Sequence, residues 1–243
     1  MNVIVLIKQV PDTTDVKLDP KTGNLIREGI ESIINPDDRH ALEAAVGLAL
    51  SEALGMGADE GILLSDRAFA GADTWATSTT LGKAVEKIGA YDLVICGRQA
   101  IDGDTAQIGP QVADYLGLPQ ATYVFEIEAV TPKSITLKRR LEDGFERVKC
   151  ALPALLTVIG ELNNPRYATI DGMIGACLEK APIRIWNAAD IGVQTRDVGL
   201  DGSLTHVIKT FAPKFQREGE ILGGEVKEAV GKLVGKLREN RLV

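Results

Sequence analysis

The stretch "YDLVICGRQAIDGDTAQIGP" (residues 91–110) decides the fold, because it reads as a buried strand, a tight turn and the start of a helix. Its first six residues form an apolar run that is typical of a buried strand. Gly97 lets the backbone turn closely where that strand ends. In a doubly wound sheet, ligands lie beyond the carboxyl ends of the strands, and the turn after Gly97 occupies this position.

Several residues of this turn have the chemistry of a nucleotide site. Gly103 permits a positive φ angle, and Asp104 with Gln107 has the spacing of a capping box that opens the next helix. The free amide groups of that helix, together with Arg98 and Thr105, would cradle a phosphate. The sequence therefore makes the turn a candidate phosphate-binding loop.

Two aspartates, Asp102 and Asp104, do not suit an anion site by themselves. They fit such a site if their carboxylates cap backbone amides or bind ribose hydroxyls while the backbone holds the phosphate. The alternative is a turn and a helix cap that bind no ligand. The residues of the turn leave both interpretations open.

The chain before residue 91 continues the pattern of a parallel sheet covered by helices on both faces. The expected elements are strands at 3–7 and 61–65, a hairpin at 15–29, a helix opening at Asn35, and a helix over 72–89 that stops at Gly89. Asn35 can act as the N-cap of the first helix, where Pro36 suits the first turn. The next two residues, Asp37 and Asp38, suit the positive end of the helix dipole.

From Ala121 onward the sequence changes to short extended runs. We expect four of them to add antiparallel strands at the edge of the sheet, at residues 121–130, 134–143, 144–152 and 153–160. The segment 163–175 is expected to be a loop whose turn at Asp171 and Gly172 holds apolar side chains away from the fold. The tail from about 180 to 224 is rich in loops.

An amphipathic helix is expected at "EVKEAVGKLVGKLREN" (residues 225–240), because its apolar residues recur at helical spacing. This face can pack on its own domain, or the tail can embrace a partner subunit. The sequence favours neither. We expect a nucleotide-binding domain over residues 1–180 and an extended arm with the helix over 181–243.

Composition excludes several classes of protein. The 243 residues include 27 Lys and Arg against 34 Asp and Glu, a net charge of −7, so nucleic acid is not an expected partner. Hydrophobic residues make up 45% and no apolar run reaches the roughly 18 to 20 residues of a membrane span. Because the first ten residues lack the features of a signal peptide, we expect a cytoplasmic protein without membrane insertion.

Histidines and cysteines are too few for several kinds of site. Cys96, Cys150 and Cys177 are far apart and odd in number, which disfavours a disulfide framework or a zinc site. His40 and His206 do not lie in a nucleophile motif, and we expect His40 on the surface of a helix or behind a binding site. We therefore expect no metal site and assign no catalytic residue.

Six longer segments resemble one known family, and they follow its order from Met1 to about Val243. They are "VLIKQVPDT" (5–13), "INPDDRHALEAA" (34–45), "MGADEGILLSDRAFAGADTWATS" (56–78), "YDLVICGRQAIDGDTAQIGPQVADYLGLPQATYV" (91–124), "LPALLTV" (152–158) and "NNPRYAT" (163–169). Each is similar to the β subunit of electron-transfer flavoprotein.

The resemblance implies an adenine-nucleotide-binding, Rossmann-like α/β fold: a doubly wound, mostly parallel sheet with antiparallel edge strands and a C-terminal tail that embraces a partner. It implies an electron-transfer flavoprotein α subunit as that partner in a heterodimer. Within the family, respiratory-type β subunits hold AMP, whereas electron-bifurcating ones hold FAD and oxidise NADH beside it. The segments "GRQAIDGDTAQ" (97–107) and "AGADTWATS" (70–78) are similar to the bifurcating type.

By this resemblance, the chain holds FAD, with AMP as the alternative, and has no reaction of its own without the α subunit. The residues expected at the cofactor are Leu6, Asn35, Pro36, Asp37, Asp38, Thr74, Thr77, Gly97, Arg98, Gln99, Ala100, Ile101, Asp102, Gly103, Asp104, Thr105, Ala106, Gln107 and Ile108. An acyl-CoA dehydrogenase or related flavoprotein is the expected acceptor. The residues expected to dock it are Arg166, Tyr167, Ile170 and Met173, with Ile170 as the anchor.

The sequence departs from the family pattern in two places. Family members place another strand and crossover between the helix after Pro36 and the segment ending at Asp59, and this chain is about twenty residues short of a parallel crossover there. Either the numbering closes over an unobserved segment, or the chain has lost part of its sheet, with loss of the cofactor as a further alternative. Where family members often carry a lysine-rich run, this chain has "ACLEKAP" (176–182).

Overall fold

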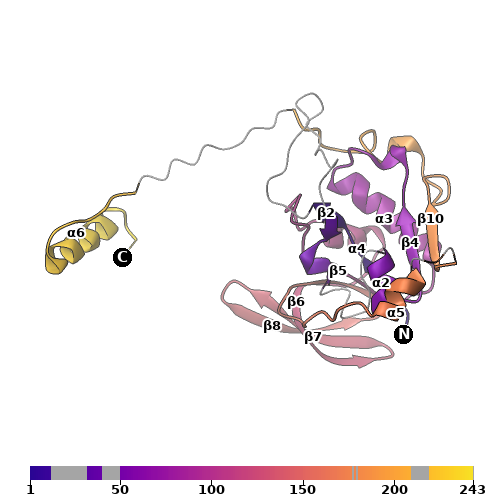
Figure 1. Cartoon of the computed structure of the whole chain (residues 1–243), viewed down its shortest axis with the longest axis horizontal. Helices are drawn as coiled ribbons and strands as arrows, with labels where there is room; N and C mark the ends of the chain where they lie inside the picture. Colours follow the sequence, from indigo (N-terminus) through magenta and orange to yellow (C-terminus); the bar gives the residue numbers. More distant parts are fainter. Residues whose placement is uncertain (12–31, 40–49, 177, 179, 209–218, 243) are drawn as a thin grey trace. The chain divides into compact units, whose positions relative to one another are not determined.

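Six of the strands that the structure describes form the main sheet, in the order β1–β5–β9–β6–β7–β8 (Figure 1). Their bounds are β1 (Val3–Leu6), β5 (Leu93–Gly97), β9 (Ala154–Val158), β6 (Gln120–Thr131), β7 (Ser134–Leu141) and β8 (Gly144–Ala151). The pairs β1–β5, β5–β9 and β9–β6 are parallel, whereas β6–β7 and β7–β8 are antiparallel. The predicted α/β fold with antiparallel edge strands is confirmed.

This computed structural model describes residues 1–11, 32–39, 50–176, 178, 180–208 and 219–242. The described chain forms two compact units, Met1–Ile208 and Lys209–Val243. The hairpin predicted at 15–29 lies outside the described residues. So do His40 and most of the helix predicted after Asn35, of which the turn at 36–39 is described. The domain boundary at 180 stays a prediction.

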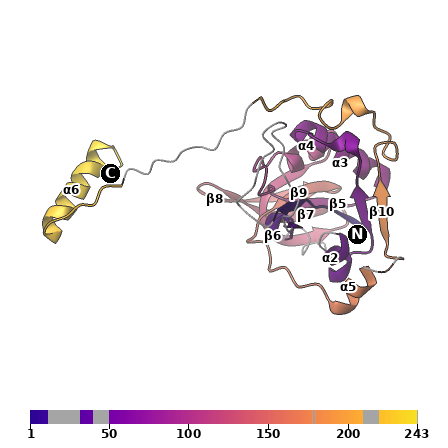
Figure 2. The same cartoon turned by 45° about the horizontal axis from the view of Figure 1, so that its top comes forward.

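Helices cover both faces of the sheet (Figure 2). On one face lie α3 (Thr74–Ile88) and α4 (Ile108–Tyr115), and on the other lie α2 (Leu50–Met56) and α5 (Ile170–Ala176). Alternate residues of β5 face opposite sides, because side chains of a strand point up and down in turn. Val94 packs towards α3 and α4, whereas Leu93 lies in the core cluster of the opposite face.

Two strands differ from their predicted places. The run 153–160 is not an antiparallel edge strand: β9 is central, parallel to both neighbours and fully buried. Among the described strands, β4 (Gly61–Leu64) does not join the main sheet and pairs in parallel only with β10 (Ile183–Trp186). β1 therefore forms an edge of the main sheet among the described strands.

The remaining elements are short. β2 (Gln9–Pro11) and β3 (Ser32–Ile34) form an antiparallel pair. The 3₁₀ turn η1 (Arg67–Phe69) follows β4, and the 3₁₀ turn η2 (Thr195–Asp197) follows β10. In the second unit, α6 (Val226–Glu239) confirms the predicted C-terminal helix. Gly89, with φ of 83°, ends α3 as predicted.

Gly97 is required where β5 meets the helical turn at 36–39. A Cβ atom at this position would lie 2.4 Å from Asp38 Oδ1 and 2.5 Å from the Asp37 carbonyl carbon. Real Cβ atoms do not approach backbone so closely, so a side chain here would push the turn away from the strand. At Gly103 the same added atom would meet nothing within 4 Å.

We expect Gly97→Ala to lower the free energy of unfolding by about 1 to 3 kcal/mol, the usual effect of overpacking. Gly103→Ala is the matched control and should change it by less than about 0.5 kcal/mol. Urea unfolding of both variants measures the difference. Equal losses in the two variants would contradict the close contact at Gly97.

Candidate functional site

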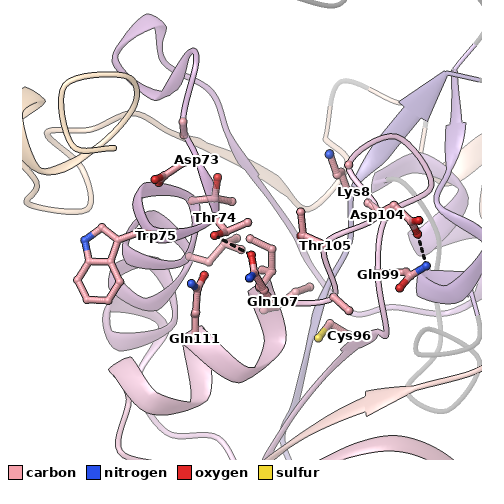
Figure 3. Close-up of a pocket in the computed structure, with 18 of the residues that line it drawn as sticks. Lys8, Asp73, Thr74, Trp75, Cys96, Gln99, Asp104, Thr105, Gln107 and Gln111 are labelled. Carbon is pink, nitrogen blue, oxygen red and sulfur yellow. Dashed lines mark hydrogen bonds between the residues drawn. The ribbon is translucent and has the colours of Figure 1, made fainter. Parts of the chain in front are cut away.

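A cavity of about 1200 Å³ lies at the carboxyl ends of β1 and β5. The N-terminal ends of α3 and α4 also line it (Figure 3). Its walls come from the turn after β5, the segment from Phe69 to Thr77, and the chain from Leu6 to Lys8. This is the position at which open α/β sheets bind ligands. The cavity is therefore the candidate functional site.

Fourteen of the predicted cofactor residues line this cavity. They are Leu6, Asp38, Thr74, Thr77, Gly97, Arg98, Gln99, Ala100, Gly103, Asp104, Thr105, Ala106, Gln107 and Ile108. Five others are not among its described lining residues, namely Asn35, Pro36, Asp37, Ile101 and Asp102. The structure thus brings together most of the predicted set, while their part in cofactor binding stays a prediction.

Three of the five residues outside the lining support the turn that forms it. The Asn35 side-chain amide donates to Gln99 O at 2.8 Å, and its oxygen accepts from Ile101 N at 3.0 Å. Asp102 accepts from Lys8 Nζ at 2.6 Å, which ties the turn to the end of β1. Asp37 lies 3.3 Å from Arg98 Nε as an ion pair. These contacts hold three residues of the cavity wall in place, namely Lys8, Arg98 and Gln99.

The turn after β5 differs from its predicted geometry. The positive φ angles belong to Asp104 (49°) and Ala106 (54°), and Gly103 is not among the positive-φ residues. Asp104 does not form a capping box with Gln107. Its carboxylate accepts instead from the Gln99 side-chain amide, while Gln107 Oε1 accepts from Thr74 Oγ1 at 3.3 Å. Short polar bonds to its own loop allow an aspartate in this backbone region.

The first turn of α4 faces the cavity without a side-chain cap. Its N-cap residue, Gln107, makes no side-chain capping bond, and Gln107 and Ile108 both line the cavity. The first amide groups of a helix lack partners within the helix, and the helix dipole adds positive potential there. Pro110 removes one of these donors at a position where none is needed. This end of α4 has the chemistry of a phosphate site.

Asp38 joins the two strand ends beneath the cavity. Its carboxylate accepts from Lys8 N and from Gly97 N, both at 2.9 Å. Burial raises the pKa of Asp38 to about 6, although the bonds from Lys8, Gly97 and Asn35 act to lower it. Burial first, and then the charge of Asp38, raise the pKa of the nearby Cys96 thiol, so this cysteine stays protonated.

The cavity is also lined by residues that the sequence did not predict as part of the site. They are Ile7, Lys8, Phe69, Ala70, Gly71, Ala72, Asp73, Trp75, Leu81, Cys96, Gln111, Leu204, Thr205 and Val207. A usable signal existed for Asp73, because an aspartate directly before a helical pattern is a common N-cap. For the residues after position 200, no local pattern indicates the site, since they reach it from a distant part of the chain.

The second half of the predicted docking segment is helical, whereas residues 163–169 form a loop as predicted. Residues from Ile170 form α5, which corrects the predicted loop with a turn at Asp171 and Gly172. Thr169 Oγ1 accepts from Gly172 N at 3.1 Å, so a threonine begins the helix. Ile170 is nevertheless 77% exposed, and Tyr167, Met173 and Arg166 are also exposed.

Cys96 and Cys150 are buried and free. Cys177 lies outside the described residues. Within the described part of the chain, no helix is long and apolar enough to cross a membrane.

Comparison with known proteins gives one family model that matches most of the chain and several relatives that match it over its full length. The model of a family described as "Electron transfer flavoprotein domain" matches residues 22–191. The "Electron transfer flavoprotein subunit beta" of Thermoanaerobacterium thermosaccharolyticum is 50% identical over 263 residues, covering 100% of each chain. The "Caffeyl-CoA reductase-Etf complex subunit CarD" of Acetobacterium woodii is 47% identical over 265 residues, again covering 100% of each chain.

A third relative, the "Acryloyl-CoA reductase electron transfer subunit gamma" of Anaerotignum propionicum, is 37% identical over 270 residues and covers 100% of each chain. The first alignment spans 263 residues against the 243 of this chain, a difference of 20. This difference agrees in size with the shortfall of about twenty residues that the sequence indicated.

The raised pKa of Asp38 predicts a dependence of stability on pH. A carboxyl whose pKa is higher in the folded protein stabilises the fold below pH 4, and this contribution is lost as the pH rises through about 6. Between pH 4 and 7, the free energy of unfolding of the wild type should fall relative to Asp38→Asn by up to about 3 kcal/mol. Urea unfolding across this range measures it. Parallel pH profiles for the two proteins would show that Asp38 titrates normally.

Proposed function

Because this chain belongs to the electron transfer flavoprotein family, as a β subunit, we propose that its cavity holds FAD and that NADH is oxidised beside it. An α subunit is the partner that family membership implies. We propose that electrons pass to the flavin of that subunit and to an acyl-CoA dehydrogenase or related acceptor, with bifurcation between two routes. A cytoplasmic location is part of the same proposal.

The uncapped start of α4 is the observation that carries this proposal. It opens into the same cavity as Arg98 and Thr105, and Lys8 enters from the end of β1. Backbone amides, a helix N-terminus and two cations suit the diphosphate of a dinucleotide. The volume of about 1200 Å³ gives room for a ligand larger than a mononucleotide.

The residues of this chain would bind and orient the cofactor. FAD supplies hydride and single-electron chemistry when it is bound. Arg98 and the amides of α4 would hold its phosphates, while Thr74 and Thr77 on α3 offer hydroxyl groups beside the start of α4. Asp38 and Asn35 keep the strand ends and the turn in position. The protein therefore contributes binding and geometry.

The names of two relatives support the proposed acceptor. One relative is a subunit of a caffeyl-CoA reductase complex, and another is the electron transfer subunit of an acryloyl-CoA reductase. Both names describe proteins that work with enzymes acting on acyl-CoA thioesters. We therefore propose a flavoprotein of this class as the acceptor.

We also propose that α6 packs on the α subunit. None of the residues described in this helix is buried, although Val226, Val230, Leu233 and Val234 lie along one apolar stripe. Such a stripe gains stability only when another surface covers it. The proposal agrees with an arm that embraces a partner.

We expect the coexpressed and purified pair to contain two FAD molecules, one of them in this chain. Acid extraction followed by chromatography should therefore release FAD and no AMP. One FAD with one AMP per pair would contradict the bifurcating proposal and support a structural AMP in this chain. The absence of any adenine nucleotide from this chain would contradict both.

We expect Ile170→Ala to weaken electron delivery to the acceptor, because a 77% exposed isoleucine can insert into a partner's pocket. The loss in affinity should be about 1 to 2 kcal/mol, with reduction of the pair by NADH unchanged. The matched control is Ile185→Ala on β10, where the isoleucine is 65% exposed. Equal losses in both assays, with a lower melting temperature, would place Ile170 in the core.

A further inference from the structure

The chain from Gly199 to Ile208 approaches the cavity beside the start of α3. Leu200 N donates to Ala70 O at 3.0 Å, and a Cβ atom at Gly199 would lie 2.0 Å from Ala68 O. This segment therefore lies directly against the connection between β4 and α3. We call residues 203–208 the strap, because Leu204, Thr205 and Val207 line the cavity.

Asp73 holds the strap with one oxygen and begins α3 with the other. Its Oδ1 accepts from Ala76 N at 2.9 Å, which caps the helix. Its Oδ2 accepts from Thr205 N at 2.9 Å and from Thr205 Oγ1 at 3.0 Å. Asp73 N donates to Ser203 Oγ at 2.8 Å, and that hydroxyl donates to Gly199 O at 2.7 Å.

Polar bonds, rather than apolar packing, fix the strap. Leu204 is 73% exposed, Val207 is 77% exposed and Ile208 is 99% exposed, so their side chains bury little surface in this chain. Partial burial acts to raise the pKa of Asp73, but the bonds from Ala76, Thr205 and Leu204 lower it below its ordinary value. The carboxylate stays ionised at neutral pH, and bonds to an ionised acceptor are the stronger kind.

Exposed apolar side chains that line a cavity gain stability when a ligand covers them. The strap borders the cavity beside Thr74, whose Oγ1 donates to Gln107 Oε1, and Thr105 lies farther along the turn after β5 (Figure 3). A dinucleotide that runs along the cavity would contact both the strap and this turn. We propose that the strap is the outer wall of the FAD site and that Asp73 is the positioning residue that holds it there.

This inference rests on the proposed function. Hydrogen exchange of the heterodimer distinguishes a failure of this inference from a failure of the proposed function. The heterodimer is stripped of nucleotide and measured with and without FAD, with AMP in a parallel sample. We expect FAD to slow exchange both at residues 97–108 and at the amides of 204–207. Slower exchange at 97–108 alone would overturn the strap as a wall while leaving the proposed function intact. Slower exchange at neither would contradict the proposed function.

Asp73→Asn tests the positioning role. Asparagine caps helices about as well as aspartate, so α3 should keep its start. Its single side-chain oxygen cannot also replace the ionised Oδ2 that accepts two bonds from Thr205. We expect exchange at 204–207 without nucleotide to become about tenfold faster, and FAD to bind several-fold more weakly. Unchanged exchange at the strap in this variant would overturn the role of Asp73.

The matched control is Asp66→Asn. Asp66 also caps a helix, accepting from Ala68 N at 3.0 Å, and also holds a distant segment, accepting from Ala188 N at 2.9 Å, but it does not line the cavity. Asp66→Asn should leave the affinity for FAD and the exchange of the strap amides unchanged. A loss of affinity equal to that of Asp73→Asn would overturn the proposal. Thr205→Val removes only the hydroxyl bond and should shift both measurements in the same direction by less, so it carries the test if Asp73→Asn does not fold.

Discussion

The Asp38 carboxylate is the point on which the site depends, because it joins three segments that are far apart in the sequence. It accepts from the backbone of Lys8 after β1 and of Gly97 at the end of β5, while its own backbone lies within the helical turn at 36–39. Both amides would otherwise be left without partners at the strand ends, at a typical cost of about 1 to 3 kcal/mol each. The absence of a side chain at Gly97 is what allows this contact.

The shape of the cavity follows from how the sheet is built. β1 ends the main sheet, and β4 lies in a separate pair with β10, so no described strand links the two. The cavity reaches from the end of β1 to the connection after β4, across the interval between them. The alignment of one relative over 263 residues, against 243 residues here, agrees in number with the shortfall that the sequence indicated.

Periodicity and end signals in the sequence predicted β5, α3 and α4. Gly97 marks the end of the apolar run of β5, Gly89 ends the long pattern of α3, and the polar turn after Gly97 precedes α4. β9 was misplaced, since a five-residue apolar run looks the same at an edge and at the centre of a sheet. α5 was missed because Gly172 lowers helix propensity. The glycine is needed for packing, because a Cβ atom at Gly172 would lie 2.6 Å from Gly55 O.

In the site, too, neighbouring residues in the sequence predicted some features, while contacts between distant residues determined others. The turn after β5 was found from its own residues, yet its left-handed positions fell on Asp104 and Ala106 instead of Gly103. Bonds from Gln99 to Asp104, and from Asn35 to the backbone of the turn, decide that geometry. Thr205 reaches Asp73 across 132 positions, and no local pattern encodes such a contact.

An electron-density map of the heterodimer, purified without added nucleotide, tests the central claim most directly. The account predicts FAD in this chain, with its diphosphate against the first turn of α4 and beside Arg98. It also predicts that the Asp38 carboxylate still bonds to the amides of Lys8 and Gly97 beneath it. A nucleotide held at any other surface of this chain, or a cavity filled only by protein side chains, would contradict the account.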